Sequence, residues 1–312
     1  MGSQFLHRSE DRGESWETIS PDLTTNDPAK QNQADSGGLS MDNSGAENHT
    51  TIFTITESPL DENIIWVGTD DGNVQLTQDG GKTWVNTTPN IEGLPRFTWA
   101  YHIEASVHDK GTAYVVFEGH STGDMTPYVY KTTDFGAHWK NIATDEIKTF
   151  ARNLQEDYIN PDLLFLGTEM GLYITNDSGQ SWSPFTNNMP PVAVHYIALQ
   201  KRTNDLVMGT HGRGVIIIDD ISPLRQITPE NLDTKLHFFA PKGLLMKDSG
   251  DGFVDSFGGE TQFVGENPAQ GAKFSYLLPK RHTFGKMTME VQDLQGQKIA
   301  TLNPKSQGVS IL

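Results

Sequence analysis

Residues Thr77–Trp84 read TQDGGKTW, a pattern of hydroxyl residue, Asp, Gly, second hydroxyl residue and Trp that returns along the chain. The other copies are SEDRGESW (Ser9–Trp16), TTDFGAHW (Thr132–Trp139) and TNDSGQSW (Thr175–Trp182), with His138 replacing the second hydroxyl residue in one of them. Such a specific pattern does not recur by chance in a chain of 312 residues. The chain is therefore a repeat protein, and the repeat decides its fold.

Each residue type in the pattern suits a tight turn between two β-strands. The Asp carboxylate can accept backbone N–H bonds across the turn, Gly adopts the positive φ that other residues resist, and Trp buries a large ring against a neighbouring sheet. The alternative that the four Asp residues are catalytic is excluded, because each Asp occupies the same position of the same turn in every repeat. The predicted structural residues are Asp11, Gly13, Trp16, Asp79, Gly81, Trp84, Asp134, Gly136, Trp139, Asp177, Gly179 and Trp182.

Short β-like runs lie upstream of these turns. IIWVGTDDG (Ile64–Gly72), LLFLGTEMG (Leu163–Gly171) and LVMGTHGRG (Leu206–Gly214) each join an apolar run to Gly-Thr and a Gly-containing turn, and TAYVVFEGH (Thr112–His120) fills the matching position in the remaining repeat. Another β-like segment precedes each of them. Each repeat is therefore predicted as one four-stranded antiparallel blade of about 40 to 45 residues, the unit of a β-propeller.

The predicted fold is all-β, with a propeller of four blades plus a half blade in residues 1–224. The half blade is Gln4–Ser20, and the polar stretch 24–47 is predicted as a loop. VIIIDDISPL (Val215–Leu224) replaces the Asp-containing turn in the last blade. Because propellers typically have 4–8 blades, we expect these blades to be a fragment of a larger propeller that continues upstream.

The remaining residues follow a different pattern. Residues 225–271 are predicted as a linker and a Gly/Asp-rich loop, and residues 272–312 as part of a β-sandwich-like module, since three strands are too few for a sandwich of about seven. Asp248, Asp251 and Asp255 suggest calcium, but their spacing departs from that of a calcium-binding loop. No metal site and no cofactor is expected.

Composition excludes several function classes. The formal net charge is −17 and the basic residues are scattered, so nucleic acid is not an expected partner. The chain has no Cys, which excludes disulfides and cysteine nucleophiles. No run approaches the roughly 18 apolar residues of a membrane span, so the chain is not expected to be membrane-embedded. Met1–Gln4 lacks the apolar core of a signal peptide, so we expect any export signal to lie outside this chain.

These motifs resemble the sortilin-type, Asp-box (BNR) β-propellers of bacterial exported proteins, many of them labelled glycosyl-hydrolase-like or sialidase-like. The resemblance rests on the Asp-containing turns, on the GTDDG, GTEMG and GTHGRG turns, and on Asp219-Asp220. The tail resembles the fibronectin/immunoglobulin-like module that often follows such propellers. The resemblance implies an extracellular, cell-surface or periplasmic location. It specifies a fold more closely than a function, because one architecture hosts many activities.

Binding residues are expected at the end of the propeller that carries the hairpin turns between the second and third strands of each blade and the links from blade to blade. Side chains there converge over the central channel, as carbohydrate or peptide recognition requires. An ordinary role as turn formers or solvated charges stays open for them. The candidate ligand-binding residues are Asp70, Arg96, Trp99, Glu169, His211 and Arg213.

The predicted function is that of a non-catalytic binding or scaffold propeller that engages a peptide, protein or glycan. The alternative is a glycoside hydrolase, sialidase-like or xyloglucanase-like, which would need two carboxylates about 5 to 9.5 Å apart. No spacing singles out a catalytic pair. GHSTG (Gly119–Gly123) resembles a serine nucleophile elbow, but a strand rather than a helix is predicted after it. The hydrolase candidates are the acids Asp70, Glu104, Glu156 and Glu169 and the arginines Arg96, Arg152 and Arg213.

Overall fold

The structure is a computed structural model that describes residues 3–31, 49–241, 243, 273–278 and 288–302. The chain divides into two compact units, Met1–Ile218 and Asp219–Leu312. Nearly all regular structure is β, and the first unit is a series of propeller blades, so the predicted all-β propeller fold is confirmed. The predicted loop 24–47 lies mostly outside the described residues.

Three antiparallel sheets in the first unit have four strands, joined in chain order. Blade 1 is β3 (Ile52–Ser58), β4 (Asp61–Thr69), β5 (Val74–Thr77) and β6 (Val85–Asn86). Blade 2 is β7 (Trp99–Ala105), β8 (Ala113–Gly119), β9 (Asp124–Thr132) and β10 (Lys140–Asn141). Blade 3 is β11 (Ala151–Glu156), β12 (Leu164–Thr168), β13 (Gly171–Thr175) and β14 (Ser183–Phe185).

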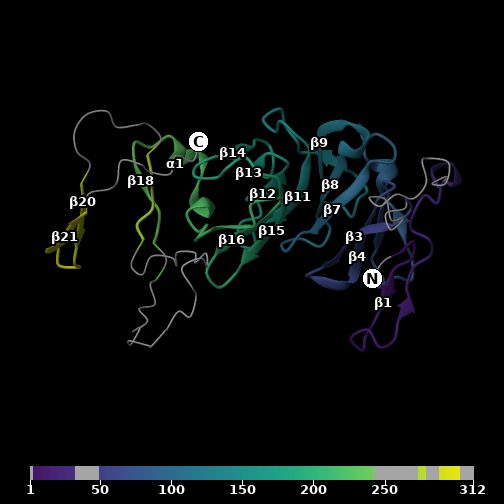
Figure 1. The fold of residues 1–312 in the computed structure, drawn as a ribbon. Coiled ribbons are helices and arrows are strands. Elements are labelled where there is room, and N and C mark those ends of the chain that lie inside the picture. The colour runs from purple at the N-terminus through teal and green to yellow at the C-terminus, as the bar shows by residue number, and fades with distance from the viewer. Residues whose placement is uncertain (1–2, 32–48, 242, 244–272, 279–287, 303–312) are drawn as a thin grey trace, which may run out of the picture. The chain divides into compact units, whose positions relative to one another are not determined.

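Two smaller sheets flank these three in the chain. Blade 4 has three strands instead of the four predicted for each repeat: β15 (Val194–Gln200), β16 (Asp205–Thr210) and β17 (Val215–Ile218). The half blade is β1 (His7–Arg8) paired with β2 (Glu17–Thr18). Short 3-10 turns lie between strands: η1 (Pro28–Lys30), η3 (Thr88–Asn90) and η4 (His120–Thr122). Figure 1 shows the blades following one another from blue to green, with the first strand of each packed near the first strand of the next.

The hydrophobic core lies between successive blades. Strand residues alternate between the face toward the preceding blade and the face toward the next. Trp66, Val115 and Phe117 are fully buried between blades 1 and 2. Leu154 and Leu166 are fully buried between blades 2 and 3. The blades are therefore held together mainly by apolar side chains, each worth about 1.5–3 kcal/mol when fully buried.

The turns between the last two strands of blades 1 to 3 and of the half blade, here called Asp turns, share one hydrogen-bond pattern. Asp79 accepts the Thr83 N–H at 2.9 Å and the Thr83 hydroxyl at 2.7 Å, while the Thr77 hydroxyl accepts the Gly81 N–H at 2.9 Å. These donors lower the pKa of Asp79 to about 2, led by the Thr83 hydroxyl. The corresponding N–H bonds reach Asp11, Asp134 and Asp177 at 2.8, 2.9 and 2.9 Å.

The Trp residues of the Asp turns are not equally buried, which corrects the expectation that each ring packs on a neighbouring sheet. Trp182 is 2% exposed, and Trp84 and Trp139 are partly buried against the core. Trp16 is 48% exposed. The difference arises because each of the other three turns packs against the blade before it, whereas Gly13 of the first turn contacts only Trp16 of its own turn.

The second unit contains short elements. They are η5 (Leu224–Gln226), α1 (Pro229–Leu232), the pair β18 (His237–Phe238) with β19 (Tyr276–Leu277), and the pair β20 (Met289–Gln292) with β21 (Lys298–Leu302). Most of η5 and all of α1 and β18 fall in residues 225–271, predicted as a linker and loop. The short helix α1 begins at a capping box formed by Thr228 and Asn231. The Gly/Asp-rich loop with Asp248, Asp251 and Asp255 lies outside the described residues. The sandwich-like module stays a prediction.

Candidate functional site

One end of the propeller unit gathers the turns between the second and third strands of each blade. In three blades such a turn bonds to the residue just before the innermost strand. The N–H of Asp70 donates to the Thr51 carbonyl at 3.0 Å, and that of His211 to the Ala193 carbonyl at 2.9 Å. The N–H of Glu169 reaches the Phe150 carbonyl at 3.3 Å. These bonds hold each turn beside the start of its own innermost strand.

A β-bulge occurs near the start of all four innermost strands. Pairing with the second strand skips one residue between Ile52 and Thr54, and the same shift recurs in β7, β11 and β15. A bulge leaves the extra residue unpaired and changes the direction of its side chain, and bulges are over-represented next to functional sites. The extra residues, one per blade, are Phe53, Tyr101, Arg152 and His195, here called the bulge row.

Members of the bulge row in successive blades lie close together. The rings of Phe53 and Tyr101 are 5.1 Å apart. The Arg152 guanidinium lies 5.6 Å from the Tyr101 ring centre and donates to its hydroxyl at 3.4 Å. The pKa of His195 is lowered, first by burial and then by the nearby charges of Arg152 and His211. The four bulges therefore build one continuous group of side chains.

Arg152 is the buried centre of this group. It is 9% exposed and donates to Glu118 at 3.0 Å and to Glu169 at 3.1 Å. Its guanidinium also lies 4.9 Å from the ring of Phe150, which stacks on His120 at 5.0 Å. Because two carboxylates compensate its charge, Arg152 is oriented by the protein itself.

The aromatic part of the group is more exposed. Phe53 is 46% exposed, and its ring lies 5.3 Å from that of Trp99. His195 stacks on His211 with ring centres 5.3 Å apart. Flat rings with polar neighbours suit the recognition of both sugars and peptide side chains.

The six predicted ligand-binding residues occupy different environments. Trp99, Glu169 and His211 contact members of the bulge row. Asp70 is 6% exposed and accepts the Thr51 N–H at 2.7 Å; burial raises its pKa. Arg213 is exposed and forms no ion pair within the part of the chain that the structure describes.

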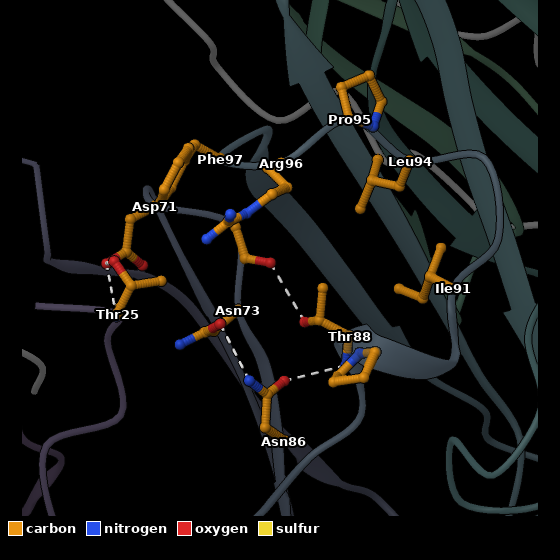
Figure 2. Close-up of a pocket in the computed structure, with 12 residues that line it drawn as sticks. Thr25, Asp71, Asn73, Asn86, Thr88, Ile91, Leu94, Pro95, Arg96 and Phe97 are labelled. Atoms are coloured by element: carbon orange, nitrogen blue, oxygen red, sulfur yellow. Dashed lines mark hydrogen bonds between the residues drawn. The ribbon is translucent and has the colours of Figure 1, made fainter. Parts of the chain in front are cut away.

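Arg96 lies in a separate pocket of about 270 Å³ at blade 1. Figure 2 shows Arg96 and Phe97 at one edge of this pocket, with Asn86 across from them and Ile91, Leu94 and Pro95 along a third side. The lining is completed by Thr25, Asp71, Gly72, Asn73, Thr88 and Pro89.

Sequence reasoning missed Phe53, Tyr101 and His195 as site residues and considered Arg152 only for a hydrolase. They share a position, because each lies one or two residues after the first residue of its innermost strand. That shared position is visible only once the strands are aligned by their pairing, since a bulge changes the alternation of faces.

Two of the four hydrolase acids meet elsewhere, between blades 2 and 3. Glu156 is 2% exposed and accepts from Ser106 at 2.8 Å, from the Val107 N–H at 2.9 Å and from Tyr114 at 2.9 Å. Burial, and then the charge of Glu156, raises the pKa of Glu104 to about 8. Of the other two acids, Asp70 is held in its turn and Glu169 is paired with Arg152.

Comparisons with solved structures find propeller proteins of low sequence identity. An ancestral GH74 enzyme is 14% identical over 67% of this chain and 25% of its own, with a TM-score of 0.47. YCF48 bound to D1 peptide is 17% identical over 55% of this chain and 50% of its own, with a TM-score of 0.41. An auxiliary nutrient binding protein from Bacteroides thetaiotaomicron is 12% identical over 57% of this chain and 40% of its own, with a TM-score of 0.43.

This chain thus matches between a quarter and a half of the length of those three proteins. No protein-family model and no curated protein matches it. Across the described ranges, no three His, Asp or Glu side chains are grouped so that they could hold a metal ion. The helices described there are also too short or too polar to cross a bilayer.

Proposed function

We propose that this chain is a binding propeller, not a catalyst, and that its ligand contacts the bulge row. The observation that carries the proposal is the same bulge in all four innermost strands, since it places Phe53, Tyr101, Arg152 and His195 in one group. A repeated backbone irregularity that re-aims one side chain per blade is typical of a functional surface.

The chemistry of the row favours a peptide, protein or glycan ligand. Phe53, Trp99 and Tyr101 offer ring faces, and His195 and His211 offer hydrogen-bonding nitrogens at the same end of the propeller. Arg152 is already paired, so it supports the rings and does not serve as a free cation. This mixture resembles the aromatic and polar composition of binding hot spots.

The four Asp turns support membership of the Asp-box (BNR) propellers, which have sortilin-type relatives, and with it an extracellular, cell-surface or periplasmic location. A glycoside hydrolase has less support. Of the four hydrolase acids, Glu104 and Glu156 are the two that lie close together, yet Glu156 already accepts three donors in the core between blades. An acid pair must reach both sides of a glycosidic bond, which a buried cluster does not do.

The test compares Phe53→Ala and Trp99→Ala with wild type on glycan and peptide arrays, followed by titration of the ligands that bind. We expect binding about tenfold weaker or worse, which corresponds to about 1.4 kcal/mol. Trp16→Ala is the control, since it removes an exposed ring from an Asp turn. If both variants bind every ligand as tightly as wild type, the bulge row is not the binding surface.

A further inference from the structure

In the pocket beside Arg96, most side-chain oxygens of the polar lining residues already accept hydrogen bonds, whereas several N–H donors have no partner among the residues that the structure describes. The side-chain oxygen of Asn73 accepts from Asn86 at 3.0 Å, and that of Asn86 accepts the Thr88 N–H at 3.0 Å. The Thr88 hydroxyl accepts the Val74 N–H at 2.7 Å and donates to the Gly72 carbonyl at 3.2 Å. These bonds, all but the one to Val74 drawn as dashed lines in Figure 2, hold the pocket wall in shape.

Two cations lie next to the ring of Phe97, which lines this pocket together with Arg96. The Arg96 guanidinium is 5.0 Å and the Lys30 ammonium 5.1 Å from the centre of the Phe97 ring. Neither takes part in an ion pair with any residue that the structure describes. In a chain of net charge −17, two cations beside one ring, neither of them ion-paired with a described residue, are a local exception.

The one acid among the lining residues is Asp71. Its carboxylate is 1% exposed and is engaged by other donors: the Thr25 N–H and hydroxyl at 2.7 Å each, and the Thr69 hydroxyl at 2.5 Å. Arg96 is the one cation among the lining residues, and no ion pair with a described residue compensates its charge. The unused donors of the lining residues are the five N–H groups of Arg96 and the second N–H of Asn73 and of Asn86.

A third side of the pocket is apolar. Ile91, Leu94 and Pro95 line it, and Ile91 is 8% exposed. A ligand can therefore present oxygens to the donors and still bury a compact apolar body against these side chains.

We propose that this pocket binds a singly charged oxyanion, a carboxylate or a sulfate ester, carried on a compact body. Arg96 provides the planar pair of N–H donors that matches such an anion. Lys30 does not line the pocket, but its ammonium lies beside the same Phe97 ring and adds a second positive charge nearby. The proposal does not rest on the bulge row, because none of the pocket residues belongs to that row.

Ligand-observed NMR titrations of the full chain at low salt test this with three probes of one shape: benzoate, phenyl sulfate and neutral benzamide. We expect at least one of the two anions to bind about tenfold or more tightly than benzamide, since only the anions use the cation pair. The ratio of benzoate to phenyl sulfate binding identifies which oxyanion the pocket prefers. Equal binding of benzamide and both anions overturns the proposal.

Variants separate this site from a structural role of the same cations. Arg96→Gln is expected to weaken the anion about tenfold, and Lys30→Gln by a smaller factor, each with a melting temperature close to that of wild type. The matched controls are Arg8→Gln and Lys110→Gln, because those cations are paired with Glu17 and Asp61. If the Arg96→Gln variant binds the anion as tightly as wild type, Arg96 only stacks on Phe97 and the proposal is wrong. Phe53→Ala and Trp99→Ala should leave the binding of the anions to this pocket unchanged. The two proposals can therefore fail separately, because the bulge row and the pocket are tested by different variants and different ligands.

Discussion

The Asp turns of blade 3 and of the half blade are closed by the same hydrogen bonds. Asp177 accepts the Ser181 N–H at 2.9 Å and its hydroxyl at 2.6 Å. Asp11 accepts the Ser15 N–H at 2.8 Å and its hydroxyl at 2.6 Å. The motif alone therefore determines the local turn, with or without a neighbouring blade.

What differs is the environment of the Trp that ends each turn. Trp182 is 2% exposed, and its indole N–H donates at 2.7 Å to the carbonyl of Ile142 in the preceding repeat. Trp16 is 48% exposed, and its indole N–H donates at 3.1 Å to Gly13 within its own turn. Burial of the same residue type thus depends on the blade beside it.

The glycines show how closely that blade approaches. A Cβ on Gly81 would lie 2.5 Å from the Ile19 carbonyl, and one on Gly179 would lie 3.0 Å from Ile142. Each neighbour is the residue directly after the last strand of the preceding sheet. The Asp turns therefore have two roles, closing their own hairpin and docking on the previous blade.

The largest expected effect is at the two Trp residues. Trp182→Ala should lower the free energy of unfolding by about 3–5 kcal/mol, because it leaves a cavity between blades 2 and 3. Trp16→Ala should change it by about 0.5 kcal/mol or less, as for other exposed positions. Chemical denaturation followed by far-UV circular dichroism measures both. Similar losses in the two variants would contradict the dependence on the preceding blade.

A smaller loss of stability is expected when the glycines of two Asp turns, Gly13 and Gly81, are replaced. Both Gly13 and Gly81 have positive φ, 96° and 100°, so Ala at either position carries a backbone strain of about 1–2 kcal/mol. Gly81→Ala should lose about 1–3 kcal/mol more, because its Cβ also meets backbone of the half blade. The same denaturation experiment checks the difference between the two variants. If Gly13→Ala is as destabilising as Gly81→Ala, only the turn conformation requires glycine.

The sequence was sufficient to predict the blades and their turns, because strand alternation, Gly positions and the Asp motif are local properties. It was not sufficient to predict the burial of Trp16, which depends on a neighbour. Nor could it predict the contacts of Arg152, since Glu118, Glu169 and Tyr101 come from three separate strands or turns.

A second reason is that glycine serves two purposes here. In the Gly-Thr motif of the second strand, a Cβ on Gly68 would meet Ala100, and one on Gly167 would meet the Val194 carbonyl. In the sequence the motif precedes a Gly-containing turn, but these glycines also let the next innermost strand pack closely. Sequence spacing alone does not distinguish the two uses.

The pH dependence of the free energy of unfolding should distinguish the interface of blades 2 and 3 from the half blade. Burial raises the pKa of Glu104 to about 8 from 4.5, and lowers that of His102, on the same strand, to about 4 from 6.5. In the Asp turn of the half blade, hydrogen bonds lower the pKa of Asp11, first of all the bond from the Ser15 hydroxyl.

Between pH 4.5 and 8 the folded chain holds a proton on Glu104 that the unfolded chain has released, so stability falls as pH rises. His102 acts in the opposite direction from pH 4 to 6.5, where the unfolded chain holds the extra proton. The two contributions offset each other below pH 6.5. A fall of about 2 kcal/mol in the free energy of unfolding from pH 6.5 to 8 remains.

Glu104→Gln should abolish this fall, measured by denaturation curves at several pH values, whereas Glu17→Gln in the half blade should preserve it. Parallel pH profiles for wild type and Glu104→Gln over that range would mean that the carboxyl between the blades is ionised in the folded protein. The interface of blades 2 and 3 would then differ from the half blade in the burial of apolar side chains, and not in a buried protonated acid.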